Sequence, residues 1–285
     1  MSSALTFQST KPLASGNHIP LLGFGVAYGF GKQEDPAELT KPSLAEALKV
    51  GYRHVDTAQM YRNEKFVGEC IRESGIPREE IFVTSKVPAS DAGYESAAKA
   101  VDISLKALGF DYLDLYLIHS PPKGTQLRLE TYKALVDAKK AGKLRDIGVS
   151  NYNVHHLEEI KGAGLEAPAV NQVEIHPFCQ QKTIVEYCNA HGIVVEAYCS
   201  VVRGALDHPV IASVARKHEK DPAQVLIRWS LQRGFVPLMR SSNPARIRSN
   251  AELDDWELDG DDMRQLDGLD KGSAGAISWN PIDVA

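Results

Sequence analysis

Short apolar runs alternate with longer amphipathic stretches along this chain, and that alternation is what most limits its fold. The runs expected as strands are Leu21–Gly25, His54–Asp56, Ile81–Lys86, Leu113–Ile118, Asp146–Ser150, Ala169–Val173, Val194–Tyr198 and Val236–Met239. The helical patterns between them cover Pro36–Val50, Glu64–Ser74, Tyr94–Leu108, Leu129–Ala141, Val154–Ala163, Thr183–His191 and Pro222–Arg233. Strand–helix alternation repeated about eight times predicts a parallel sheet with crossover helices.

Glycines just past the last periodic residue support these helix ends. They are Gly51, Gly75, Gly109, Gly142, Gly192 and Gly234. The residue after a helix often adopts a left-handed conformation, which glycine accepts most readily.

The number of units favours a closed barrel. Eight units in a chain of 285 residues match a (β/α)8 TIM barrel better than an open sheet. No linker or low-complexity tract divides the chain, so we expect one domain over residues 1–285. An opening segment, Leu5–His18, carries the turn residues Gly16-Asn17 and predicts a β-hairpin over the N-terminal face. The tail SWNPIDVA is expected at the barrel mouth, where Trp279 would lie.

Composition excludes several classes of protein. The net charge of −5 gives no general attraction to nucleic acid or anionic membranes. No secretory signal and no run of about 18 apolar residues is visible, so we expect a cytoplasmic protein. The four cysteines form no CxxC pair and are expected as free core thiols: Cys70, Cys179, Cys188 and Cys199. No heptad or sheet-edge signal suggests assembly, and we expect a monomer.

Four reactive side chains fall at the ends of predicted strands or just after them. Asp56, Lys86 and His119 follow the second, third and fourth strands, and Tyr61 lies in the loop after the second. Singly, each has an ordinary explanation, such as a helix cap for Asp56 or a structural role for His119. The C-terminal ends of barrel strands meet at one mouth, where barrel enzymes hold their catalytic residues.

Together these side chains make an acid–base device. Reducing a carbonyl requires a proton on oxygen, and a tyrosine with a pKa of about 10 is a weak donor unless its anion is stabilised. The Lys86 ammonium supplies that stabilisation, and Asp56 can hold the ammonium. A neutral His119 imidazole can hydrogen-bond the carbonyl oxygen and orient it. No His, Asp or Glu cluster has metal-ligand spacing, so no metal is expected, and His155-His156 are interpreted as a solvated pair.

Several motifs resemble those of the aldo-keto reductase family. They are GYRHVDTAQMYRNE (51–64), the TSK that ends at Lys86, LIHSPP (117–122), GKLRDIGVSNYN (142–153) and NQVEIHP (171–177). The resemblance extends over nearly the whole chain and places Asp56, Tyr61, Lys86 and His119 at the family's tetrad positions. It implies an NADPH-dependent reductase of aldehydes or ketones, with Tyr61 as general acid. GFGVAYG (23–29) lacks the GxGxxG spacing of a Rossmann fold and corresponds to the family's first strand and loop.

The resemblance also implies a cofactor site. Ser150, Asn151 and Gln172 would hydrogen-bond the nicotinamide carboxamide, and Tyr198 would stack on its ring. The adenosine end maps to MRSSNPARIRSN (239–250), after the last strand, where barrels commonly bind phosphate. There Arg240, in place of the family's usual lysine, would hold a ribose 2′-phosphate together with Ser241, Asn243 and Arg246. Ser249 replaces a glutamate that contacts adenine in the family, so that contact is not carried over, whereas Asn250 is carried over as a cofactor residue. A solvated basic helix is the alternative interpretation of this segment.

Substitutions near the expected pocket suggest a wide, open site. Tyr28 stands where the family often has tryptophan, Val87-Pro88 replaces a common Leu-Trp, and Ser120 follows His119 where some members have tryptophan. The connection from Cys199 to a helix near Asp207 is short. Fewer indoles and short loops favour small to medium carbonyls, such as aldehydes, α-keto esters and diketones.

Two other functions fit parts of the pattern. A non-catalytic NADPH-binding barrel could act as a regulatory partner, although the complete tetrad argues against it. Family members that reduce a conjugated carbon–carbon double bond carry glutamate in place of the tetrad histidine, whereas this chain retains His119. The direction of the reaction stays open, because Tyr61 would act as a base in alcohol oxidation.

Overall fold

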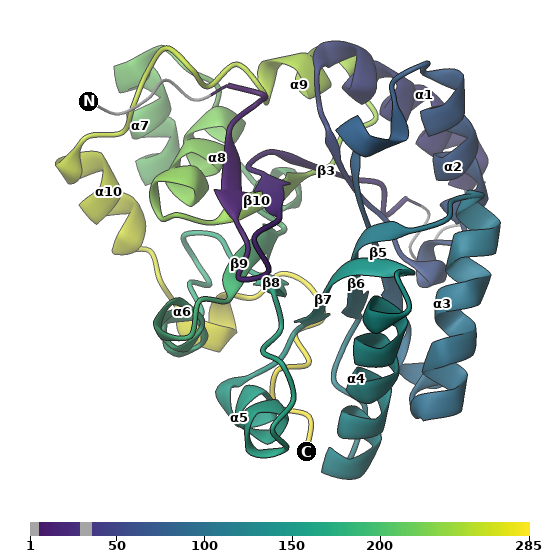
Figure 1. Cartoon of the computed structure of the whole chain (residues 1–285). Coiled ribbons are helices and arrows are strands. Elements are labelled where there is room, and N and C mark those ends of the chain that lie inside the picture. Colours follow the sequence, from purple (N-terminus) through teal and green to yellow (C-terminus); the bar gives the residue numbers. More distant parts are fainter. Residues whose placement is uncertain (1–5, 29–35) are drawn as a thin grey trace.

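Eight parallel strands close into a barrel in the computed structural model, which describes residues 6–28 and 36–285 (Figure 1). Around the barrel the order is β10-β3-β4-β5-β6-β7-β8-β9. The strands are β3 (Gly23–Gly25), β4 (His54–Asp56), β5 (Phe82–Val87), β6 (Leu113–Ile118), β7 (Leu144–Ser150), β8 (Val170–Glu174), β9 (Val194–Tyr198) and β10 (Val236–Met239). The (β/α)8 TIM barrel predicted from the strand–helix alternation is confirmed.

Helices surround the barrel. They are α1 (Pro36–Val50), α2 (Glu64–Glu73), α3 (Tyr94–Leu108), α4 (Thr125–Lys140), α5 (Val154–Gly162), α6 (Lys182–Ala190), α7 (Pro209–His218), α8 (Pro222–Gln232), α9 (Pro244–Ser249) and α10 (Gly260–Asp267). Short 3-10 turns complete the connections at η1 (Gln59–Tyr61), η2 (Arg78–Glu80), η3 (Ala89–Asp91), η4 (Val202–Gly204) and η5 (Gly272–Gly275). The helix expected near Asp207 is α7, which begins with Pro209 at a favourable N-terminal position.

The expected and observed boundaries differ mainly at α4. The apolar period begins at Leu129, but the helix begins earlier, at Thr125. Its first turn is mostly polar, so the apolar period does not reveal it. The six glycines expected past helix ends all adopt positive φ, as Gly109 does at 71° and Gly142 at 77°. At these positions a side chain would strain the backbone, so glycine ends the helix at low cost.

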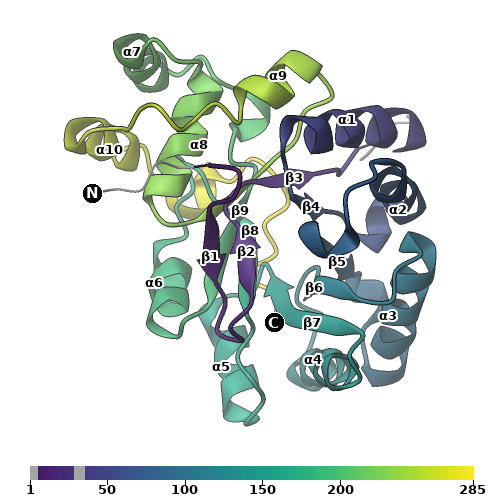
Figure 2. The same cartoon turned by 45° about the horizontal axis from the view of Figure 1, so that its top comes forward.

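An antiparallel hairpin lies across one end of the barrel (Figure 2). Its strands are β1 (Thr10–Pro12) and β2 (His18–Pro20), joined by a turn in which Gly16 has a φ of 92°. Leu13 and Ile19 pack against residues near the starts of the barrel strands, including Phe82, Val194 and Val236. The hairpin therefore covers the N-terminal face as predicted, although its strands begin only at Thr10, and Leu5 lies outside the described residues.

The four cysteines are free thiols, and all but the partly exposed Cys199 are buried. No helix in the described part of the chain has the length and apolar character needed to cross a bilayer.

Helix α2 can approach α3 closely because Gly68 has no side chain. A Cβ at this position would lie 1.9 Å from the carbonyl oxygen of Leu108. Since that oxygen belongs to backbone, the helices would have to move apart. We expect Gly68→Ala to lower the free energy of unfolding by about 2 kcal/mol, measured by urea denaturation.

Gly162→Ala is the matched control. Gly162 ends α5, and a Cβ at this position would have no atom within 4 Å, so alanine should be neutral there or raise stability by up to about 1 kcal/mol. Equal effects of the two substitutions would contradict the close-packing explanation.

Candidate active site

Strand ends bring the four predicted reactive residues together. Asp56 is the last residue of β4, Lys86 is the penultimate residue of β5, and His119 directly follows β6. Parallel pairing sets β4 beside β5 and β5 beside β6, so these three side chains occupy neighbouring positions at the C-terminal end of the barrel. Tyr61 lies in η1, the turn that follows β4.

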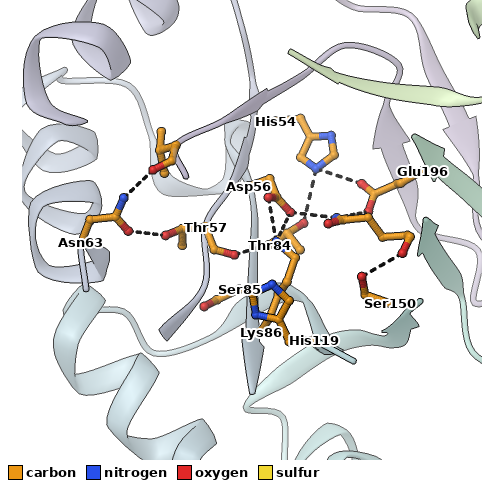
Figure 3. A network of polar contacts seen from close by, with 12 residues as sticks. His54, Asp56, Thr57, Asn63, Thr84, Ser85, Lys86, His119, Ser150 and Glu196 are labelled. Atoms are coloured by element: carbon orange, nitrogen blue, oxygen red, sulfur yellow. Dashed lines mark hydrogen bonds and ion pairs between the residues drawn. The ribbon is translucent and has the colours of Figure 1, made fainter. Parts of the chain in front are cut away.

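Lys86 and Asp56 form a buried ion pair. The ammonium donates to both carboxylate oxygens at 2.7 Å and to the carbonyl oxygen of Thr57 at 2.9 Å (Figure 3). All three protons of the ammonium thus have acceptors. This complete set of partners offsets the cost of taking a cation out of water.

Tyr61 is held beside this pair by the loop that follows β4. The Lys86 ammonium lies 5.3 Å from the centre of the Tyr61 ring, and the His119 ring meets the Tyr61 ring edge-on with centroids 5.5 Å apart. The buried side chain of Asn63 fixes the loop, since it accepts from the Thr57 hydroxyl at 2.6 Å and donates to the carbonyl of Val26 at 2.7 Å. Tyr61, Lys86 and His119 therefore form one cluster.

The charges in this cluster follow from burial and from the ion pair. Burial alone would lower the pKa of Lys86, but the charges of Asp56 and Tyr61 outweigh it and raise that pKa. Burial and the nearby Lys86 cation lower the pKa of His119 to about 3, so its imidazole is neutral near pH 7. Burial raises the pKa of Tyr61, while Lys86 acts in the opposite direction.

The residues expected to hold the nicotinamide are also in mutual contact. Ser150 donates to the backbone carbonyl of Gln172 at 2.8 Å, and the Asn151 amide donates to the His119 carbonyl at 3.1 Å. The Tyr198 hydroxyl donates to Asn151 Oδ1 at 2.8 Å. Ser150 and Tyr198 end β7 and β9, Asn151 directly follows β7, and Gln172 lies in the middle of β8. Asn151 contacts His119 and Gln172 contacts Asp56, so these residues border the tetrad.

The segment after β10 carries exposed arginines. Arg248 pairs with Glu46 at 2.6 Å, whereas Arg240 and Arg246 have no carboxylate partner among the residues that the structure describes. Asn243 caps α9, accepting from the backbone N–H groups of Ala245 and Arg246. Asn250, at the other end of α9, is buried.

Tyr28 joins this segment to the first barrel strand. Its side chain is buried, its hydroxyl donates to the carbonyl of Ser241 at 2.8 Å, and the Arg240 guanidinium lies 5.6 Å from its ring centre. Arg240 also donates to the carbonyl of Ala27. Tyr28 and Arg240 therefore hold the residues that follow β3 against the segment that follows β10.

The C-terminal tail is fastened at the mouth by a buried carboxylate that sequence reasoning missed. Glu174, at the end of β8, accepts from the Ile277 N–H at 2.5 Å and from the Ser278 N–H and hydroxyl at 3.1 and 2.6 Å. The next residue, Trp279, is 63% exposed, and its carbonyl oxygen lies 3.2 Å from the Tyr198 hydroxyl. Ser120, which is also expected in the pocket, directly follows His119 in the chain, and its side chain is buried.

The interpretation of His155-His156 as a solvated pair is wrong for His156. Its ring is buried: Nδ1 accepts from the Asn153 N–H at 3.1 Å, and Nε2 lies 2.7 Å from the Val284 carbonyl. The tail therefore also rests on the start of α5, a contact that no local pattern reveals. Within the described residues, no group of three or more His, Cys, Asp or Glu side chains is placed to hold a metal ion.

Comparisons with known proteins decide the family. The model of the aldo/keto reductase family matches residues 21–271. This chain belongs to the aldo/keto reductase family. The family's enzymes are oxidoreductases that reduce carbonyls and generally use NAD(P)H.

Individual relatives cover almost the whole chain. A glyoxal reductase from Bacillus subtilis is 45% identical over 98% of this chain and 98% of its own length. The crystal structure of an aldo/keto reductase from Brucella melitensis, 42% identical, superposes with a TM-score of 0.87 and covers 94% of this chain and 100% of the other. An aldo-keto reductase from Bombyx mori, solved in complex with NADP, is 32% identical with a TM-score of 0.86, covering 95% of this chain and 94% of the other.

Glu174 provides a test of how the tail is held. Burial alone would raise the pKa of Glu174, but hydrogen bonds from His176, Ser278 and Ile277 outweigh it and lower that pKa below 4.5. A carboxyl with a depressed pKa stabilises the fold above its unfolded pKa, and this stabilisation is lost as pH falls through the folded value. We expect tail protection at neutral pH and its loss in acid, measured by amide hydrogen exchange at Ile277 and Ser278.

Glu174→Gln should release the same segment at neutral pH. Replacing charge-assisted hydrogen bonds with neutral ones should speed exchange at these two amides about tenfold. Glu166→Gln, at an exposed carboxylate that pairs with Lys139 at 2.8 Å, is the control and should leave the tail protected. Unchanged exchange in Glu174→Gln would show that other contacts hold the tail.

Proposed function

We propose that this protein reduces aldehyde and ketone carbonyls to alcohols with NADPH, and that Tyr61 donates the proton. The observation that carries the proposal is the buried Lys86–Asp56 pair beside the Tyr61 ring, with a neutral His119 against the same ring. A buried cation next to a tyrosine is the arrangement that a proton-donating phenol requires.

Each residue of the tetrad has a separate task. Lys86, kept charged by Asp56, stabilises negative charge on the Tyr61 oxygen as the proton leaves. His119 is neutral near pH 7, so a ring N–H can donate to the substrate oxygen without adding a competing positive charge. Asp56 touches neither the proton nor the substrate in this scheme; it holds the ammonium in place through two 2.7 Å contacts.

The polar groups on the other side of the mouth fit a nicotinamide. Ser150 and Asn151 carry hydroxyl and amide groups that would hold the carboxamide, and Tyr198 offers an aromatic surface. The Gln172 amide nitrogen already donates to two carboxyls, which leaves its oxygen to accept from the carboxamide N–H groups. When bound, the reduced nicotinamide supplies the hydride for the substrate carbon.

A 2′-phosphate fits the segment after β10. Arg240 and Arg246 are exposed and not paired with a described carboxylate, whereas Arg248 is neutralised by Glu46. Ser241 and Asn243 add polar groups, and Asn250 is a further cofactor residue that the family resemblance implies. Guanidinium groups bind phosphate in a bidentate manner, which favours NADPH over NADH.

We further propose small to medium carbonyls as substrates. The relative named glyoxal reductase supports α-dicarbonyls within this class. Tyr28 stands where the family often has a larger indole and Ser120 where some members have one, and Trp279 would meet substrate at the mouth. We propose a cytoplasmic monomer with one domain over residues 1–285, which acts on small molecules and not on nucleic acid or membranes.

Replacing the proton donor tests the reaction. Tyr61→Phe should lower kcat for NADPH oxidation with an aldehyde panel by at least about 100-fold, because general acid catalysis is lost. Cofactor affinity, followed by protein fluorescence quenching, should stay within about twofold. Tyr94→Phe, at an exposed tyrosine on α3, is the matched control and should retain full activity.

Two outcomes would refute the proposal. Cofactor binding by the wild-type protein without turnover of any carbonyl would favour a regulatory barrel. Full activity in Tyr61→Phe would assign the proton to another group.

The cofactor preference has its own test. Arg246→Gln should weaken NADPH binding about tenfold, the loss of one charge-assisted contact, and leave NADH binding nearly unchanged. Arg248→Gln, at the arginine paired with Glu46, should alter neither affinity. Equal losses for both cofactors in Arg246→Gln would mean that this side chain does not contact the 2′-phosphate.

A further inference from the structure

A second buried carboxyl lies deeper in the barrel, behind the Lys86–Asp56 pair. Glu196 is on β9, two residues before Tyr198, so both side chains are on the same side of the strand. Its side chain is fully buried, and its carboxyl lies 3.3 Å from His54 Nε2 (Figure 3). None of the steps assigned to the tetrad uses either residue.

The barrel makes room for this pair of ionisable groups. A Cβ on Gly23 would lie 2.9 Å from His54 Nδ1, so the His54 ring occupies space that another residue at position 23 would fill. His54 Nε2 also lies 3.3 Å from the Thr84 hydroxyl, and the His54 ring packs edge-on against Phe82 with centroids 5.1 Å apart. The His54 ring that meets Glu196 is thus held by contacts from β5 as well as by its own strand, β4.

One amide connects this carboxyl to the tetrad. Gln172 Nε2 donates to Glu196 Oε2 at 2.8 Å and to Asp56 Oδ2 at 2.9 Å. Asp56 in turn accepts from Lys86, which lies against Tyr61. A continuous series of contacts therefore runs from Glu196 through Gln172 and Asp56 to the proposed proton donor.

We propose that Glu196 is a positioning residue whose charge, acting through Gln172 and Asp56, governs how readily the Lys86–Tyr61 pair releases a proton. The inference rests on the proposed function of Tyr61. Stability alone gives no reason for such a group, because replacing buried ionisable groups with apolar ones is often neutral or stabilising.

The charges that face Glu196 indicate the direction of its effect. Burial and the Asp56 charge raise the pKa of Glu196, and burial lowers the pKa of His54 to about 4. Near neutral pH His54 is therefore uncharged, so it does not offset a charge on Glu196. Once Glu196 ionises, its anion favours the Lys86 cation and opposes the Tyr61 anion.

The substitution Glu196→Gln removes that anion and keeps an acceptor of the same shape. Without the Glu196 anion, Tyr61 should ionise at lower pH. We expect the tyrosinate absorbance of Tyr61, obtained as the difference between each protein and its Tyr61→Phe version, to move to lower pH by about half a unit or more in Glu196→Gln. The alkaline loss of carbonyl reduction should move the same way.

Two further variants provide an alternative substitution at Glu196 and a matched control. Glu196→Met also removes the charge and is expected to shift the Tyr61 titration in the same direction. It replaces Glu196→Gln in the test if the glutamine variant does not fold. Glu64→Gln is the matched control, since Glu64 is a buried carboxyl whose pKa burial also raises and which accepts from Ser85, the neighbour of Lys86. It lies outside the series of contacts and should leave the Tyr61 titration unchanged.

The outcomes separate the two proposals. An unchanged Tyr61 titration in both Glu196 variants, or no Tyr61 ionisation below alkaline unfolding in any of the proteins, would overturn the role of Glu196. An equal shift in Glu64→Gln would do so as well, by showing a general response to losing a buried carboxyl. Absence of carbonyl turnover in the wild-type protein would overturn the proposed function alone, because the absorbance titration needs no turnover.

Discussion

The ion pair between Lys86 and Asp56 is the constraint on which the rest of the site depends. Two opposite charges inside a barrel must be paired, and their remaining hydrogen-bonding groups must also find partners, because an unpaired buried charge is strongly destabilising. The Thr57 carbonyl accepts the remaining ammonium proton, and Gln172 donates to the carboxylate. The polar interior then extends to Glu196, while the loop that Asn63 braces carries Tyr61 against the cation.

Most of the fold could be predicted because its signals are local. The strand period, the glycines past helix ends and the number of repeats each limit the architecture without reference to distant residues. The tetrad was accessible for the same reason: once the strands are placed, the barrel brings their C-terminal ends together. The start of α4 was placed too late because its polar first turn contributes nothing to the apolar period.

The contacts that sequence reasoning missed join residues far apart in the chain. Glu174 binds amides of the tail about 100 positions later, and His156 meets Val284. In a buried strand, a single acidic residue such as Glu196 signals that some partner exists but does not identify it. Only the closed barrel shows that the partners of Glu196 are Gln172 and His54, which lie on two other strands.

The hairpin over the N-terminal face has a consequence for how the chain assembles. Leu13 and Ile19 belong to a cluster that includes Val236, and the Lys11 ammonium donates to the carbonyl of Gly234. The hairpin residues therefore cannot complete their packing until some 220 later residues have been synthesised. Such distant contacts slow folding. During synthesis the apolar side chains of the hairpin stay exposed until the last barrel strand is available to cover them.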